Sequence, residues 1–152
     1  MRRAPSFAFL LVAASMAVTP VAHAALGHAA DSVRLDGMHM SARMATTAAA
    51  SFTEHTLTLP NGGTIREFST GGTVFAVGWR GPARPDLRQL LGEHFETLQT
   101  GTAIVGAHRL RAPILVDRGD LVVHSAGHSG AFRGFAYLPA LIPAGVTAAD
   151  LQ

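Results

Sequence analysis

The chain is 152 residues long and carries 12 basic and 10 acidic residues, eight histidines and no cysteine. Without cysteine it cannot form disulfides, and thiolate metal ligands and cysteine nucleophiles are excluded as well. The basic residues are all arginine and are scattered, apart from a short run at 109–111, whereas a nucleic-acid-binding domain usually presents a clustered basic face. We therefore expect no nucleic-acid partner.

Residues 1–24 have the pattern of a secretory signal peptide. Two arginines precede an apolar run at 7–18, and an Ala-His-Ala triplet at 22–24 provides a cleavage site. The apolar run is shorter than the roughly 20 residues that a membrane-spanning helix needs. We expect a mature chain that begins at Ala25, has no membrane span and is periplasmic or secreted.

Residues 25–52 are rich in alanine, serine, threonine and methionine and lack a sustained apolar period, which indicates a flexible leader. Some helix is expected around 41–50, because alanine is the best helix former. The remaining residues, 53–152, are numerous enough for one domain with one hydrophobic core.

The first part of this domain predicts three strands joined by tight turns. Polar and apolar residues alternate over 53–59, and the turn-forming residues at 60–63 lead into a return strand at 64–69. A third strand is expected at 73–79. On that strand Phe75, Val77 and Trp79 are expected to share one face.

A helix and further strands complete the predicted domain. Asp86 is placed to cap a helix, with Gln89 completing a capping box. Apolar residues share one helical face at positions 87, 90, 91, 95 and 98, and Gly101 is expected to end the helix. Further strands are expected at 114–116, 121–125 and 131–138. The pattern predicts an α+β domain, in which an antiparallel sheet (a three-stranded meander, then two or three C-terminal strands) packs on one amphipathic helix.

The stretch His-Ser-Ala-Gly-His at 124–128 is the first candidate site. In an extended strand, residues four apart point to the same side, so His124 and His128 could share a metal ion such as zinc. His94, beside the apolar stripe of the predicted helix, is a candidate third ligand, although a structural zinc site needs four. The alternative is that His124 pairs across the sheet and His128 lies in a turn, hydrogen-bonded to the backbone.

The overlapping letters Gly-His-Ser-Gly-Ala at 127–131 are close to the serine nucleophile motif of hydrolases. That motif requires a helix after the serine and a histidine further along the chain. A strand is predicted after Ser129, however, and no histidine follows His128. We therefore assign no catalytic residue and expect a protein that is not an enzyme.

All methionines after residue 24 lie at 38–44, in a Met38-His39-Met40 triplet and at Met44. Thioether and imidazole groups are ligands that Cu(I) favours, so this cluster is a candidate copper site. The alternative is a leader that simply tolerates methionine. No other cofactor is expected.

Trp79, Arg80 and Arg84 are candidates for a surface contact. Aromatic residues at strand spacing usually belong to a core, and the helix is expected to cover Trp79. Together with Arg88, the two arginines flank the loop that follows the third strand and could bind an anion. Scattered arginines more often solvate a surface or pair with local carboxylates.

Two segments together resemble a known family. The stretches WRGPARPDLRQLL and GHSGAFRGFAYLP, within 64–95 and 120–152, are similar to the domain-of-unknown-function 2844 family of small exported bacterial proteins. The resemblance runs from about Thr53 to the C-terminus and implies export and one compact domain, but no reaction or cofactor. We expect a non-enzymatic domain that binds an unknown periplasmic or extracellular protein. The alternative is a periplasmic protein that binds zinc or copper.

Overall fold

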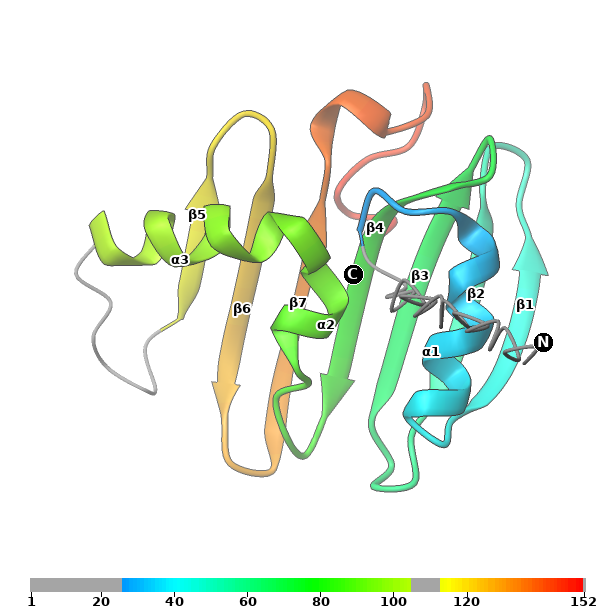
Figure 1. The fold of residues 1–152 in the computed structure, drawn as a ribbon, viewed down its shortest axis with the longest axis horizontal. Coiled ribbons are helices and arrows are strands. Elements are labelled where there is room, and N and C mark those ends of the chain that lie inside the picture. The colour runs from blue at the N-terminus through cyan, green and yellow to red at the C-terminus, as the bar shows by residue number, and fades with distance from the viewer. Residues whose placement is uncertain (1–25, 105–112, 152) are drawn as a thin grey trace, which may run out of the picture.

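The computed structural model describes residues 26–104 and 113–151, so the predicted signal peptide and the arginine run at 109–111 lie outside the described residues. Seven strands form one sheet in the order β1-β2-β3-β4-β7-β6-β5 (Figure 1), and every neighbouring pair is antiparallel. The α+β class with an antiparallel sheet is thereby confirmed. The strands are β1 (Arg43–Ala48), β2 (Thr53–Thr58), β3 (Thr64–Thr70), β4 (Thr73–Gly81), β5 (Ile114–Asp117), β6 (Val122–His128) and β7 (Ala131–Tyr137).

The α-helices lie on one face of this sheet (Figure 1). They are α1 (Val33–His39), α2 (Leu87–Leu91) and α3 (Phe95–Ile104), with short 3-10 helices at Ala30–Ser32, Gly92–His94 and Pro139–Leu141. Each of the three α-helices contributes to the larger core, through Val33, Leu90 and Leu98 for example, and strand residues such as Ile65 and Val123 complete it. Burial of these apolar side chains between two layers supplies the main stabilisation of the fold.

A smaller core lies on the opposite face of the sheet, where Phe68, Phe75 and Ala76 pack against Leu151 near the end of the chain. The backbone of the tail comes close to β4, since a Cβ atom at Gly78 would lie 3.1 Å from the carbonyl oxygen of Leu151. The absence of a side chain at Gly78 therefore lets the tail cover the middle of this face.

The flexible leader expected at 25–52 is wrong for the part that the structure describes. Leu26 and Val33 are buried in the larger core, and residues 43–48 form β1, not a helix. Six residues of β1 pair in continuous register with β2. Hydrogen bonds to β2 hold β1 in place. The sequence of β1 has only a weak apolar pattern, so the strand could not be predicted from it. The folded domain includes residues 26–52.

The single helix expected after Asp86 is divided in two. The cap is as predicted, because the Asp86 carboxylate accepts the N–H groups of Arg88 (2.9 Å) and Gln89 (3.4 Å). Gly92 then adopts φ 53°, which interrupts the helix before α3 begins. Gly101 does not end the helix but lies within α3, where a Cβ would be 2.8 Å from Cγ1 of Val116.

The expected common face for Phe75, Val77 and Trp79 is also wrong. Val77 and Trp79 belong to the larger core, whereas Phe75 belongs to the smaller one. The register between β3 and β4 shifts at this point: Phe68 pairs with Ala76 and Ser69 with Val74, which leaves Phe75 without a partner. An extra residue of this kind is a β-bulge, and it reverses the alternation of side chains beyond it.

Candidate anion-binding site

The histidine-rich stretch at 124–128 forms the end of β6, and Ser129-Gly130 makes the turn into β7. The strand continues through Gly127 (φ 138°), where a Cβ would lie 2.3 Å from the carbonyl oxygen of Ala131, so only glycine fits. The Gly130 N–H donates to the carbonyl of Pro82 (2.9 Å). This bond fixes the hairpin to the loop between β4 and α2.

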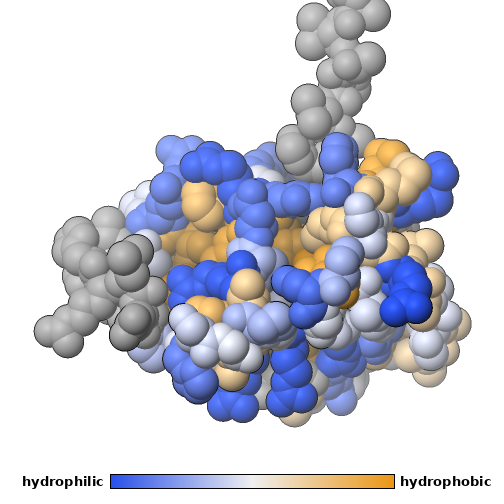
Figure 2. Space-filling view, turned by 90° about the horizontal axis from the view of Figure 1, so that it is seen from below, coloured by the Kyte–Doolittle hydropathy of each residue, from blue (hydrophilic) through white to orange (hydrophobic). Residues whose placement is uncertain are grey.

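A concavity of about 540 Å³ lies at this junction. Figure 2 looks at this end of the molecule and shows hydrophilic side chains over much of it. The lining residues come from β4, the following loop and the β6–β7 hairpin: Arg80, Gly81, Pro82, Ala126, Gly127, His128, Gly130, Ala131, Phe132 and Arg133. Among them are two arginines and a histidine but no carboxylate.

Arg80 and Arg133 are directly opposite each other in the β4–β7 register. Like charges in that position repel each other and destabilise a sheet. Neither side chain has a hydrogen bond or an ion pair among the described residues. The sheet thus holds two positive charges side by side at the concavity without a counter-charge from the described part of the chain.

Arg84 adds a third guanidinium beside the concavity. Its charged group lies 5.4 Å from the ring centroid of Phe132, one of the lining residues. Its Nε and Nη2 atoms are buried and have no hydrogen-bond acceptor among the described residues. Buried donors of this kind are normally satisfied, because removing them from water without a partner costs free energy.

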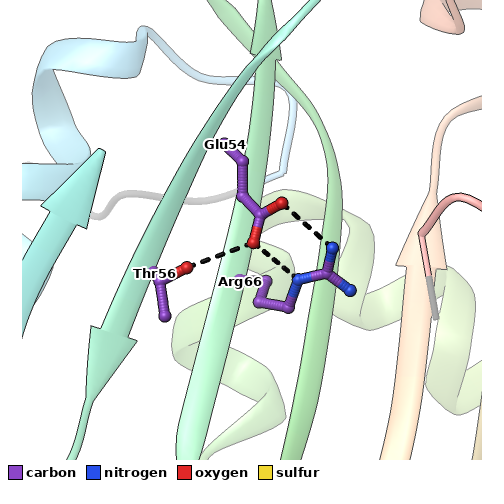
Figure 3. A network of polar contacts seen from close by, with 3 residues as sticks. All are labelled: Glu54, Thr56 and Arg66. Atoms are coloured by element: carbon purple, nitrogen blue, oxygen red, sulfur yellow. Dashed lines mark hydrogen bonds and ion pairs between the residues drawn. The ribbon is translucent and has the colours of Figure 1, made fainter. Parts of the chain in front are cut away.

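Arg66, in the same sheet, forms an ion pair with Glu54 that is typical of an arginine with a structural role (Figure 3). Its Nε and Nη2 atoms donate to the two carboxylate oxygens of Glu54, at 2.7 and 3.0 Å, and Thr56 donates to Glu54 as well (3.1 Å). The hydrogen bond and charge of Arg66 lower the pKa of Glu54. The arginines at the concavity have no such carboxylate in the part of the chain that the structure describes, which distinguishes them from this structural pair.

The three candidate zinc ligands are not brought together. The His124 ring packs against Phe135, with centroids 4.9 Å apart, on the face opposite the helices. His94 lies on the helical side, where its Nε2 is 3.1 Å from the Cβ position of Gly27. His128 pairs through Nδ1 with the carbonyl oxygen of Ser129 (2.9 Å), beside the turn. In the described parts of the chain, no group of three or more histidines and carboxylates could hold a metal ion.

The methionine cluster is divided between the end of α1 and the start of β1. Met38 and Met44 are 59% and 46% exposed, and Met40 packs partly buried against the larger core. His39 is the last residue of α1 and is exposed. The copper site remains an expectation from the sequence.

Trp79 is not available for a surface contact, contrary to its place among the candidates. It is only 4% exposed, and its indole ring occupies the space beside Gly134, where a Cβ would lie 2.4 Å from Cζ2. Arg80, the next residue along the strand, points to the other face of the sheet and lines the concavity.

A buried carboxyl pair between α1 and the sheet carried no sequence signal. Asp36 and Glu67 are each 1% exposed, and the Gln89 side chain donates to Oδ1 of Asp36 (3.0 Å). Burial, and secondarily the charge of Asp36, raises the pKa of Glu67 to about 8. Across the register from Glu67, the His55 ring pairs with Thr46 and Ser69 (3.2 Å each), and burial lowers the pKa of His55. These polar side chains lie between α1 and the sheet. We therefore assign them a structural role.

These features define an α+β domain with one antiparallel sheet, a helical layer and a cationic concavity at one end. The chain belongs to the family described as a protein of unknown function (DUF2844), whose sequence profile matches residues 22–151. The match includes α1 and β1, which the resemblance from about Thr53 onward had left out. No match was found among curated proteins or solved structures. Among the described residues, no helix is both long enough and apolar enough to span a membrane.

Proposed function

We propose that the protein is an exported, non-enzymatic binding domain, and that its concavity recognises an oxyanion group on a periplasmic or extracellular partner. The observation that carries this proposal is the direct opposition of Arg80 and Arg133 in a concavity without a lining carboxylate. An anion bound between the two guanidinium groups would replace their repulsion by attraction.

The chemistry of the side chains favours a carboxylate or a phosphate. A guanidinium group is planar and donates two parallel hydrogen bonds to either kind of oxyanion. His128 also lines the concavity, but its Nδ1 already donates to the carbonyl oxygen of Ser129, so the neutral ring offers an anion no second N–H donor. A cationic metal ion is disfavoured at His124 and His128, because Arg133 pairs with Ala126, midway between the two histidines.

Calorimetric titration with inorganic phosphate and with a short acidic peptide tests the proposal and distinguishes the two sources of oxyanion. We expect the wild-type protein to bind at least one of them, with an affinity that falls as salt is added. Arg80→Gln and Arg133→Gln should each weaken binding by about tenfold or more, as expected for a charged hydrogen bond worth roughly 1.5–3 kcal/mol.

Arg34→Gln is the matched control, since Arg34 is exposed on α1, away from the concavity. It should leave the affinity unchanged. Failure of the wild type to bind either probe, or equal losses in all three variants, would rule out the concavity as the binding site.

Export has its own test, because it rests on residues 1–24 alone. Expressed in a bacterium with its full sequence, the protein should be recovered outside the cytoplasm. Mass spectrometry should find an N-terminus at Ala25. An intact chain retained in the cytoplasm would contradict this part of the proposal.

A further inference from the structure

Within the described residues, the edge strand β1 lacks the devices by which proteins protect a sheet edge. All six of its residues are exposed, and they pair with β2 without a register shift. Its sequence, Arg-Met-Ala-Thr-Thr-Ala, contains no proline and has one charge, at its first residue. Natural edge strands are usually shortened, bulged or interrupted by charges or proline. The other edge, β5, is only four residues long and follows Pro113.

The backbone groups on the outer side of β1 can be assigned from the turn that joins it to β2. There the Ala49 N–H donates to the carbonyl of Phe52 (2.8 Å), which makes these two residues a hydrogen-bonded pair. Hydrogen-bonded and non-hydrogen-bonded pairs alternate along an antiparallel ladder. The N–H and carbonyl groups of Met44, Thr46 and Ala48 therefore point away from β2, toward the open edge.

The outward groups are spaced evenly about Thr46. A second copy of β1, in antiparallel orientation, therefore presents matching donors and acceptors to the first. We infer that two copies of the chain pair through β1, with the twofold axis at Thr46. Thr46 then exchanges hydrogen bonds with Thr46 of the partner subunit, and Met44 does so with Ala48 of the partner subunit. In this register every outward group of the strand is satisfied, and one sheet runs through both copies. A one-strand interface of this kind is isologous, as in most symmetric dimers.

The side chains fit the same register. Met44 and Thr46 are on the helical face, since their β2 partners are Leu57 and His55, and Leu57 belongs to the larger core. The long Met44 side chain would lie opposite the small side chain of the partner's Ala48. Paired threonines are favourable cross-strand neighbours. Met38, on the adjoining helix α1, is a second exposed apolar side chain that this interface would bring closer to the partner.

The mass of the purified protein, measured by sedimentation over a wide range of concentration, tests the inference. We expect a reversible dimer. Thr46→Lys and Thr46→Glu each place two like charges at the axis, and each should weaken dimerisation by roughly tenfold. An equimolar mixture of the two variants should restore the dimer, because opposite charges then face each other.

Thr100→Lys provides the control, since Thr100 is also an exposed threonine but lies on α3, which contacts β5 at the other edge of the sheet. It should dimerise as the wild type does. Circular dichroism confirms that each variant is folded. A wild-type protein that stays monomeric, or a dimer that neither Thr46 variant weakens, would overturn the inference.

Hydrogen exchange gives a second measurement that needs no variant. The amide hydrogens of Met44, Thr46 and Ala48 should be protected in the wild-type protein, and their protection should increase with protein concentration. Rapid exchange of all three at every concentration would also overturn the inference.

Discussion

At the scale of single residues, the side chain of Glu67 links the stability of the domain to pH. Burial raises its pKa to about 8 in the folded state, well above the ordinary value of 4.5. Between these two values the folded protein holds a proton that the unfolded chain has lost. The contribution of Glu67 is therefore most favourable at low pH, and stability falls as the pH rises from about 4.5 to 8.

Glu67→Gln should remove this dependence, because glutamine keeps the shape of the protonated side chain and carries no charge. At pH 9 we expect the variant to be more stable than the wild type, by on the order of 3 kcal/mol in urea denaturation. Glu54→Gln is the control, for which we expect the opposite effect on stability. Glu54 has a lowered pKa through Arg66, so its replacement should destabilise the protein near neutral pH and have less effect in acid. If the Glu67→Gln and wild-type pH profiles were parallel, Glu67 would not be the group responsible.

The candidate anion site was partly visible in the sequence. Arg80 and Arg84 were candidates because they flank a rigid loop, and both lie at or beside the concavity. Arg133 could not be connected with them, since it is some 50 residues away and only the pairing of β4 with β7 brings it opposite Arg80. Long-range strand pairing of this kind leaves no local pattern. The buried Asp36 and Glu67 were missed for the same reason.

At the scale of secondary-structure elements, the contact between α3 and β5 depends on Gly101. A Cβ at this position would lie 2.8 and 3.0 Å from the two γ-methyl groups of Val116. Gly101→Ala should therefore destabilise the domain by roughly 1–3 kcal/mol, the usual range for overpacking, despite the better helix propensity of alanine. Thermal denaturation measures the effect.

Thr100→Ala is the control on the same helix, since Thr100 is exposed. It should change stability by about 0.5 kcal/mol or less. A Gly101→Ala protein as stable as the wild type or more stable would show that helix propensity, and not the approach of β5, decides this position.

Elements with a strong local pattern were predicted well, and elements held by their neighbours were not. Asp86 as a helix cap and the turn around 60–63 depend on local chemistry, and the structure has them. The strand expected at 121–125 instead continues to His128 as β6. Residues 26–48 carry no clear period, and their helix and strand are stabilised by burial of Leu26 and Val33 and by pairing with β2. The bulge at Phe75 likewise arises from the pairing of two strands, which alternation within one strand cannot reveal.

At the scale of the whole molecule, the proposed functions use separate parts of one sheet. The helices cover one face and the C-terminal tail covers the middle of the other. The concavity lies where β4 and β6 end and β7 begins, and the edge strand β1 lies three strands away from β4. A dimer formed through β1 would therefore leave both copies of the concavity open. Binding of an anion and pairing of two copies can be tested independently, because no residue takes part in both.

The most direct test of the anion site is the melting temperature in inorganic phosphate, compared with chloride at the same ionic strength. A ligand that binds the folded state raises its stability as the ligand concentration rises. Phosphate also stabilises proteins in general, so the double variant Arg80→Gln/Arg133→Gln is the reference. We predict that the double variant melts at a higher temperature than the wild type without phosphate, and that the wild type gains more from phosphate than the double variant does. Equal gains for the two proteins would contradict the account.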